Sequence, residues 1–151
     1  MKKEPKYKLE ITRQQAKTIN AACELAARLG MGQIFDLEDF LPMREDMDWS
    51  AWHETTREIK KLLRPFLHEK IRGSIHSYFS ILSTDTKESA KVACDIHEVL
   101  RHALSWDYAV DSGMIESLDT PRDWKTMSGV NYDPPHGWSG KQLPKIERVE
   151  E

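Results

Sequence analysis

The segment CDIHEVLRHALSWD, residues 94–107, carries the clearest structural signal in the chain. Its apolar residues recur at the spacing of one face of a helix, which predicts a helix with one side buried in a core. We place this helix between a cap at Asp85 or Thr86 and about Trp106. The apolar stripe consists of Val92, Ile96, Val99, Leu100, Ala103 and Leu104.

Two more long helices are predicted nearer the N-terminus, one before and one after the acidic segment 36–48. Thr12 and Gln15 form a capping box, so one helix begins there and runs to about Leu29, with Gly30 placed to end it. Its alanines allow a neighbouring helix to approach closely. Another helix covers about residues 50–71, capped by Asp48 or Ser50, kinked or split at Pro65 and ended by Gly73.

The first of these helices has two opposite stripes. The apolar stripe consists of Ile19, Ala22, Ala26 and Leu29. The polar stripe consists of Lys17, Asn20, Glu24 and Arg28.

Both ends of the chain are predicted to be extended. Residues 7–11, YKLEI, alternate apolar and polar side chains, which indicates a short strand. Residues 109–151 are rich in Gly, Pro and Asp, yet they contain Trp124, Tyr132 and Trp138, and a disordered tail usually lacks aromatic residues. The fold class is therefore mainly α, a bundle of about three long helices with a short N-terminal strand and an extended C-terminal arm.

The predicted domain organisation follows from this division. A helical core domain covers residues 1–108, and the arm of residues 109–151 docks on that core or on a neighbouring subunit. A floppy tail is the alternative. At 151 residues, a single packed core is the natural expectation.

Composition excludes several classes of protein. A net charge of −3 argues against general nucleic-acid binding, which depends on Lys and Arg neutralising phosphates. The opening MKKEPKYKLE has no apolar run, so we expect no signal peptide, and no run approaches the roughly 20 residues that span a membrane. Cys23 and Cys94 are expected to be reduced thiols of a cytosolic protein.

Charge is concentrated in two segments. Residues 36–48 are acidic, and residues 57–72 are basic. The basic run could face phosphates, but such runs are more often the solvated side of a helix. Its cationic residues are Arg57, Lys60, Lys61, Arg64, Lys70 and Arg72, partly compensated by Glu58 and Glu69.

The pair His97 and His102 resembles a damaged zinc-protease motif, but the histidines are five residues apart, about 140° around a helix. Asp95, Glu98 and His102 do share one face, although a carboxylate metal centre needs a matching set from a second helix, which the chain lacks. We therefore expect no metal and no cofactor. The absence of a nucleophile motif or a phosphate-binding glycine loop favours a binding protein over an enzyme.

Arg101, His102 and Trp106 gather near one end of the same helix. A guanidinium can grip a phosphate with two hydrogen bonds, and an indole can stack on a base. These residues therefore suit a phosphorylated or aromatic small ligand. The alternative is structural, with edge residues in surface pairs and Trp106 in the core.

Short motifs in the chain resemble small uncharacterised proteins encoded by tailed bacteriophages. The resemblance covers most of residues 7–107 and, loosely, VNYDPP, but His97 stands where an aromatic such as Tyr would be expected. It rests on an opening Thr-x-x-Gln-Ala helix, an Arg-x-x-Met-Gly-Gln turn and an Arg-His…Trp-Asp ending. These positions are Thr12, Gln15, Ala16, Arg28, Met31, Gly32, Gln33, Asp95, Arg101, His102, Trp106 and Asp107.

The resemblance implies a virus-made protein acting in the cytoplasm of an infected bacterium. By analogy with accessory phage proteins, we expect a non-enzymatic protein that binds and sequesters a nucleotide-derived immune signal of the host. We also expect a homo-oligomer without membrane or nucleic-acid partners. The expected ligand-binding residues are Arg28, Gln33, Arg101, His102, Trp106, Tyr132 and Trp138.

Two other functions stay open at this point. The protein could be an inhibitor or adaptor that uses the acidic 36–48 segment or residues 123–144 on a host protein. It could also be a metal-dependent hydrolase that uses Asp95, Glu98 and His102.

Overall fold

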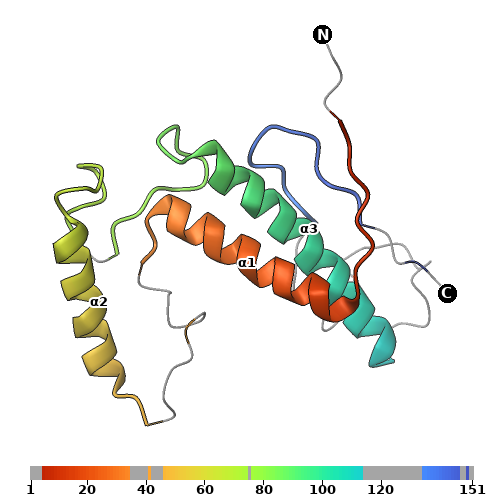
Figure 1. Ribbon diagram of the computed structural model, residues 1–151, viewed down its shortest axis with the longest axis horizontal. Coiled ribbons are helices and arrows are strands. Elements are labelled where there is room, and N and C mark those ends of the chain that lie inside the picture. Colours follow the sequence, from red (N-terminus) through yellow and green to blue (C-terminus); the bar gives the residue numbers. More distant parts are fainter. Residues whose placement is uncertain are drawn as a thin grey trace.

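The computed structural model describes residues 5–34, 41, 46–74, 76–113, 134–146 and 149. These residues contain three α-helices, α1 (Arg13–Met31), α2 (Trp49–Leu63) and α3 (Glu88–Asp111), and no strand (Figure 1). The mainly helical fold expected from the sequence is confirmed. The predicted strand at residues 7–11 is not found, because a strand needs a pairing partner and the described part of the chain provides none.

The start of α1 is the predicted capping box, but its end is displaced by two residues. The Gln15 backbone N–H donates to Thr12 Oγ1 at 3.2 Å, and the Thr12 N–H donates to Gln15 Oε1 at 2.8 Å. Gly30 remains helical, and Gly32 ends the helix with a left-handed φ of 87°. A Cβ at Gly32 would lie 2.7 Å from Ile71 Cδ1, so both backbone conformation and space require glycine there.

Helices α1 and α3 lie side by side and antiparallel (Figure 1). Gly30, near the end of α1, touches Ala90 near the start of α3 so closely that a Cβ on Gly30 would collide with the Ala90 Cβ. At the other end, Arg13 pairs with Asp111 and lies 3.8 Å from Asp107. Arg13 is a cation at the positive N-terminal end of the α1 dipole, and Asp111 is an anion at the negative C-terminal end of the α3 dipole. Both placements are unfavourable, and the ion pair offsets their cost.

The face of α1 that meets α3 is not the apolar stripe of the sequence. Ala27 is buried and Asn20 and Glu24 are partly buried, whereas Ala22 and Ala26 are exposed. Gly30 permits the close approach of the two backbones at Ala90, because any larger residue there would collide with the Ala90 Cβ. The packed face of α1 is therefore mixed in polarity, with Ala27 and Gly30 beside Asn20 and Glu24.

Helix α3 supplies most of the core of the described residues. Trp106 and Ala109 are fully buried, and Ala93 and Leu100 are nearly so. The helix continues to Asp111, past the predicted end at Trp106 and past the predicted domain boundary at residue 108. Thr86 does not cap it, since the Thr86 hydroxyl instead donates to the Ser80 carbonyl at 2.8 Å and closes the preceding loop.

Helix α2 lies to one side of the α1–α3 pair (Figure 1). Asp48 caps it, as predicted, by accepting from the Ser50 N–H at 2.8 Å. It ends at Leu63 rather than continuing past Pro65 to Gly73, because proline removes a helical N–H and its ring clashes with the preceding turn. Lys60 and the Phe79 backbone connect the parts: Lys60 Nζ donates to the Ser77 carbonyl at 2.5 Å, and Phe79 N–H donates to the Met31 carbonyl at 2.8 Å.

We expect Gly30→Ala to destabilise the protein. Alanine improves intrinsic helix propensity by about 1 kcal/mol, whereas the collision with Ala90 costs up to about 3 kcal/mol, so the free energy of unfolding should fall by up to about 2 kcal/mol. Urea unfolding followed by circular dichroism measures the change. The double variant Gly30→Ala/Ala90→Gly should recover most of the loss. As a matched control, Gly73→Ala, where nothing lies within 4 Å, should change stability by no more than about 0.5 kcal/mol.

Candidate functional site

His102 and Trp106, two of the predicted ligand-binding residues, form a buried pair. Trp106 Nε1 donates to His102 Nε2 at 3.2 Å, with the rings edge-to-face at 6.2 Å between centroids. Trp106 is 0% exposed and His102 is 7% exposed. Since Nε2 accepts, it carries no proton in this arrangement. The indole leaves no surface on which a ligand could stack, so the structural alternative holds for this pair.

Arg28 and Arg101 are not brought together. Arg28 donates from Nε and Nη2 to Glu24 Oε1 at 3.0 and 2.8 Å, and Arg101 donates from Nη2 to Glu98 Oε2 at 2.9 Å. Since Gly30 meets Ala90 in the antiparallel pair, Arg28 lies beside the first turns of α3, roughly two turns from Arg101. Gln33 follows α1, and its backbone N–H donates to the Arg28 carbonyl at 2.9 Å.

Of the predicted aromatic residues of the arm, Trp138 is described and Tyr132 lies outside the described residues. The Trp138 backbone N–H donates to Asp95 Oδ1 at 2.6 Å, and the ring lies 5.4 Å from that of His136. The Ser139 N–H donates to Asp95 Oδ2 at 3.3 Å, and the Ser139 hydroxyl also donates to this oxygen. Residues 134–146, which we call the C-terminal segment, therefore dock on α3 of the same chain through Asp95.

Asp95 is buried, and its three donors explain how a carboxylate can be accommodated there. From the sequence, Asp95 was a candidate metal ligand and one position of the phage-protein motifs, and its role as an anchor was not predicted. Its two companions in that set, Glu98 and His102, are bound to Arg101 and Trp106. Within the described ranges, no three His, Cys, Asp or Glu side chains are grouped to hold a metal ion. The hydrolase alternative therefore has no assembled ligand set in this part of the chain.

Both cysteines are free thiols with raised pKa values. Burial raises the pKa of Cys23. Burial, followed by the nearby carboxylates of Glu98 and Asp95, raises the pKa of Cys94 to about 11. Because the thiolate is the nucleophilic form, neither cysteine is prepared for covalent catalysis.

A cationic groove is formed by α2 and the loop that follows it. Its volume is about 420 Å³. Arg57, Lys61 and Arg64 lie at i, i+4 and i+7, so they share one face of the chain that enters the loop. The residues that line it are Arg57, Lys60, Lys61, Arg64, Arg72, Gly73, Ser74 and His76. These cations belong to the basic segment 57–72. From the sequence, a solvated helix face was the favoured interpretation of this segment, and a phosphate site was the alternative.

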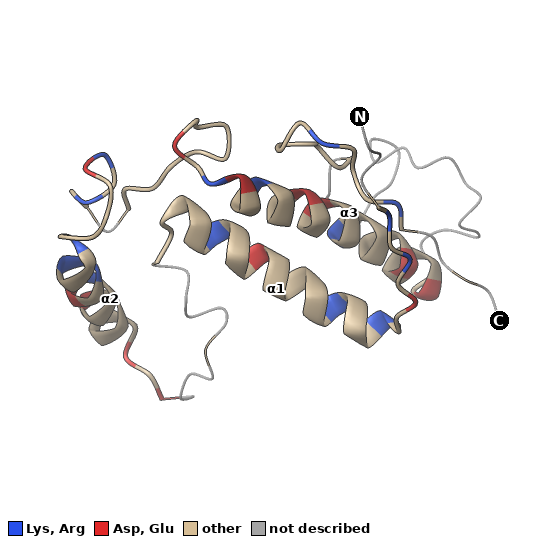
Figure 2. Ribbon diagram, turned by 45° about the horizontal axis from the view of Figure 1, so that its top comes forward, with Lys and Arg blue, Asp and Glu red and all other residues tan. Residues whose placement is uncertain are grey.

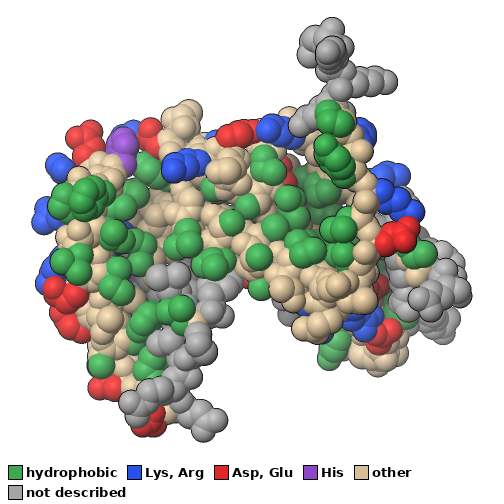
Figure 3. All heavy atoms as spheres, in the orientation of Figure 1, with side chains coloured by type: hydrophobic (Ala, Val, Ile, Leu, Met, Phe, Trp, Pro, Cys, Tyr) green, Lys and Arg blue, Asp and Glu red, His purple; other side chains and the backbone are tan. Residues whose placement is uncertain are grey.

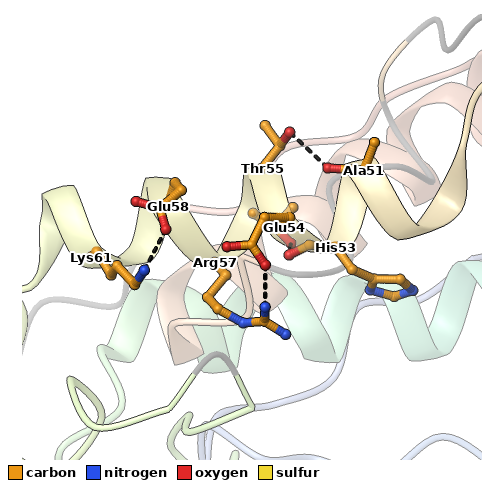
Figure 4. A network of polar contacts seen from close by, with 8 residues as sticks. Ala51, His53, Glu54, Thr55, Arg57, Glu58 and Lys61 are labelled. Carbon is orange, nitrogen blue, oxygen red and sulfur yellow. Dashed lines mark hydrogen bonds and ion pairs between the residues drawn. The ribbon is translucent and has the colours of Figure 1, made fainter.

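The cations of this groove differ in how they are held. On α2, Arg57 pairs with Glu54 and Lys61 pairs with Glu58 (Figure 4). The side chains of Arg64 and Arg72 make no hydrogen bond or ion pair within the described part of the chain. Figure 2 shows basic residues gathered where α2 enters the loop.

Lys60 lines the same groove but is structural. Its ammonium group is buried against the Ser77 carbonyl, and this burial lowers its pKa. It therefore holds one wall of the groove in place.

No protein-family model matches the chain, and neither a curated protein nor a solved structure matches it. The resemblance to phage proteins accordingly stays a prediction. None of the described helices is long and apolar enough to span a membrane.

Asp95→Ala should release the C-terminal segment. The amide protons of Trp138 and Ser139 lose their acceptor, so their hydrogen exchange should become at least tenfold faster, with a loss of about 2 kcal/mol of stability. Exchange measured by mass spectrometry on the full chain tests this. Glu98→Gln is the matched control, and it should leave these amides protected. Unchanged exchange in Asp95→Ala would show that the anchor lies elsewhere.

Cys94 should react slowly and with an unusual pH dependence. At pH 8, a thiol with a pKa of about 11 has about 100-fold less thiolate than one at the ordinary value of 9.0. The alkylation rate of a Cys23→Ser variant should therefore keep rising towards pH 11, whereas the unfolded chain should level off near pH 9. Because the folded pKa is raised, the contribution of Cys94 to stability is complete below pH 9 and is lost towards pH 11. A folded-state plateau near pH 9 would contradict the burial of this thiol.

Proposed function

We propose that this protein binds a small phosphate-bearing ligand of the nucleotide class in the cationic groove and does not convert it. The observation that supports this is the convergence of Arg57, Arg64 and Arg72 around about 420 Å³. Pockets of about 300–1,000 Å³ are typical of small-molecule sites. A cluster of guanidinium groups around such a volume suits a multiply charged anion.

The arginines of the groove can exchange their contacts for a phosphate at little cost. Arg64 and Arg72 are exposed, and the carboxylate partners of Arg57 and Lys61 are themselves well exposed. Exposed ion pairs contribute only about 0–1 kcal/mol, so a bidentate phosphate contact competes well with them. The groove adjoins the C-terminal end of α2, where the helix dipole opposes an anion, so the side chains must supply the attraction.

The lining favours binding over catalysis. His76 and Ser74 are present, and the His76 backbone N–H donates to Ser74 Oγ at 3.3 Å. The other described residues that line the groove are cations and Gly73, with no carboxylate among them, so the lining attracts an anion rather than forming an acid–base pair. The proposal is therefore a binding protein.

The biological role that we propose is sequestration of a nucleotide-derived immune signal in the cytoplasm of an infected bacterium. The resemblance of the α1 and α3 motifs to phage proteins supports this role. The groove contributes the chemistry that such a ligand requires, and it replaces Arg101, His102 and Trp106 as the proposed binding residues.

An adaptor function is the second candidate, and exposed apolar residues beside the groove favour it. Leu62 is 75% exposed and Phe66 is 85% exposed, one turn apart on the chain. Figure 3 shows hydrophobic side chains on the α2 side of the molecule as well as over α1 and α3. Such a patch suits contact with another protein.

The double variant Arg64→Ala/Arg72→Ala tests the proposal. Isothermal titration of the full chain with cyclic dinucleotides and ADP-ribose should give at least tenfold weaker binding, because two phosphate contacts are removed. Both side chains are exposed, so the melting temperature should not change. Wild-type affinity should also fall as salt is raised.

Arg101→Ala is the matched control, and it should retain the wild-type affinity. Loss of binding in Arg101→Ala with none in the double variant would return the site to α3. If these compounds do not bind the wild type and Leu62→Ser/Phe66→Ser removes a host protein from a pull-down, the adaptor function replaces the proposal.

A further inference from the structure

The N-terminal segment before α1 presents a row of exposed apolar side chains. Tyr7 is 91% exposed, Leu9 is 70% exposed and Ile11 is also exposed. They alternate with Lys8 and Glu10, so in an extended chain the three apolar side chains point to one side. The backbone of residues 7–11 makes no hydrogen bond to the described part of the chain. An exposed apolar segment with free backbone groups is a template for pairing with another chain.

The sequence of this segment is complementary to itself. When two copies of YKLEI run antiparallel about Leu9, Tyr7 lies opposite Ile11 of the second copy and Leu9 lies opposite Leu9. Lys8 then lies opposite Glu10 of the second copy, and Glu10 lies opposite its Lys8. Opposite charges and apolar pairs directly across an antiparallel ladder are both stabilising.

From this complementarity, we infer that residues 7–11 pair with the same residues of a second copy, as an antiparallel two-stranded ribbon centred on Leu9. The contact is isologous, so it closes a symmetric dimer. It also explains why the alternating pattern of residues 7–11 forms no strand in a single chain. This inference is independent of the cationic groove.

Two contacts in the single chain position the segment. The Thr12–Gln15 capping box holds the end of the segment at the start of α1. Lys6 Nζ donates to Gln142 Oε1 at 3.3 Å, on the side of the extended chain that also carries Lys8 and Glu10. The side that carries Tyr7, Leu9 and Ile11 is exposed in the single chain.

The side chains that would exchange partners are accessible. Lys8 Nζ lies 2.8 Å from Glu10 Oε1 within one chain, and both side chains are more than two-thirds exposed. A pair of this kind contributes little, so it can be replaced by two pairs between chains. Substitutions at these positions touch no buried residue and leave the helices intact.

Charge reversal tests the inference by sedimentation velocity of the full chain over a concentration series. The wild type should dimerise. Lys8→Glu and Glu10→Lys place like charges opposite each other, so each should raise the dimer dissociation constant at least about tenfold. The double swap Lys8→Glu/Glu10→Lys restores opposite charges and should dimerise like the wild type. An equimolar mixture of the two single variants should form a heterodimer, although each alone is weakened.

Lys17→Glu is the matched control, because it makes the same charge change at an exposed site on α1 and should not affect the dimer. Leu9→Pro removes a central N–H and should abolish the dimer while the circular dichroism of the helices is retained. A wild type that stays monomeric throughout would overturn the inference, as would a dimer that survives both Lys8→Glu and Leu9→Pro.

Discussion

The contact between Gly30 and Ala90 is the constraint on which the described fold depends. It sets how closely α1 and α3 approach, and this distance determines which side chains of α1 are covered. The face of α1 that carries Gly30 is the one covered, although that face also carries Asn20 and Glu24. Thus the interhelical surface is mixed in polarity, and the apolar Ala22 and Ala26 remain outside. With this contact fixed, Arg13 reaches the far end of α3, and Trp106 is enclosed completely.

Asp95 plays a second organising role, at the boundary between the helices and the C-terminal segment. A carboxylate is costly to bury, so its position is tolerated only because the Trp138 and Ser139 donors converge on it. The same interaction fixes the irregular C-terminal segment to α3. Two polar residues of α3 that suggested a metal or ligand site in the sequence make intramolecular contacts instead. Asp95 anchors the C-terminal segment, and His102 accepts a hydrogen bond from Trp106.

The chemistry proposed for this protein lies on α2, away from that core. The residues on the α1–α3 surface are engaged by one another, whereas Arg64 and Arg72 are exposed beside a groove. Placing the ligand site outside the packed pair allows its cations to bind and release an anion without disturbing the core. The YKLEI segment lies beyond the other end of α1, so binding and dimer formation would use separate surfaces.

Local sequence alone determined the three helices and the N-terminal caps of α1 and α2. Thr12, Gln15 and Asp48 act through hydrogen bonds to residues two or three positions away, and these contacts can be read from spacing. Contacts between distant residues were decided only by the tertiary structure. The buried face of α1, the role of Asp95 and the gathering of Arg57, Arg64 and Arg72 all depend on segments that are far apart or turn back in space. Spacing along one helix gives the direction of each side chain, but burial and pairing depend on which other element lies there.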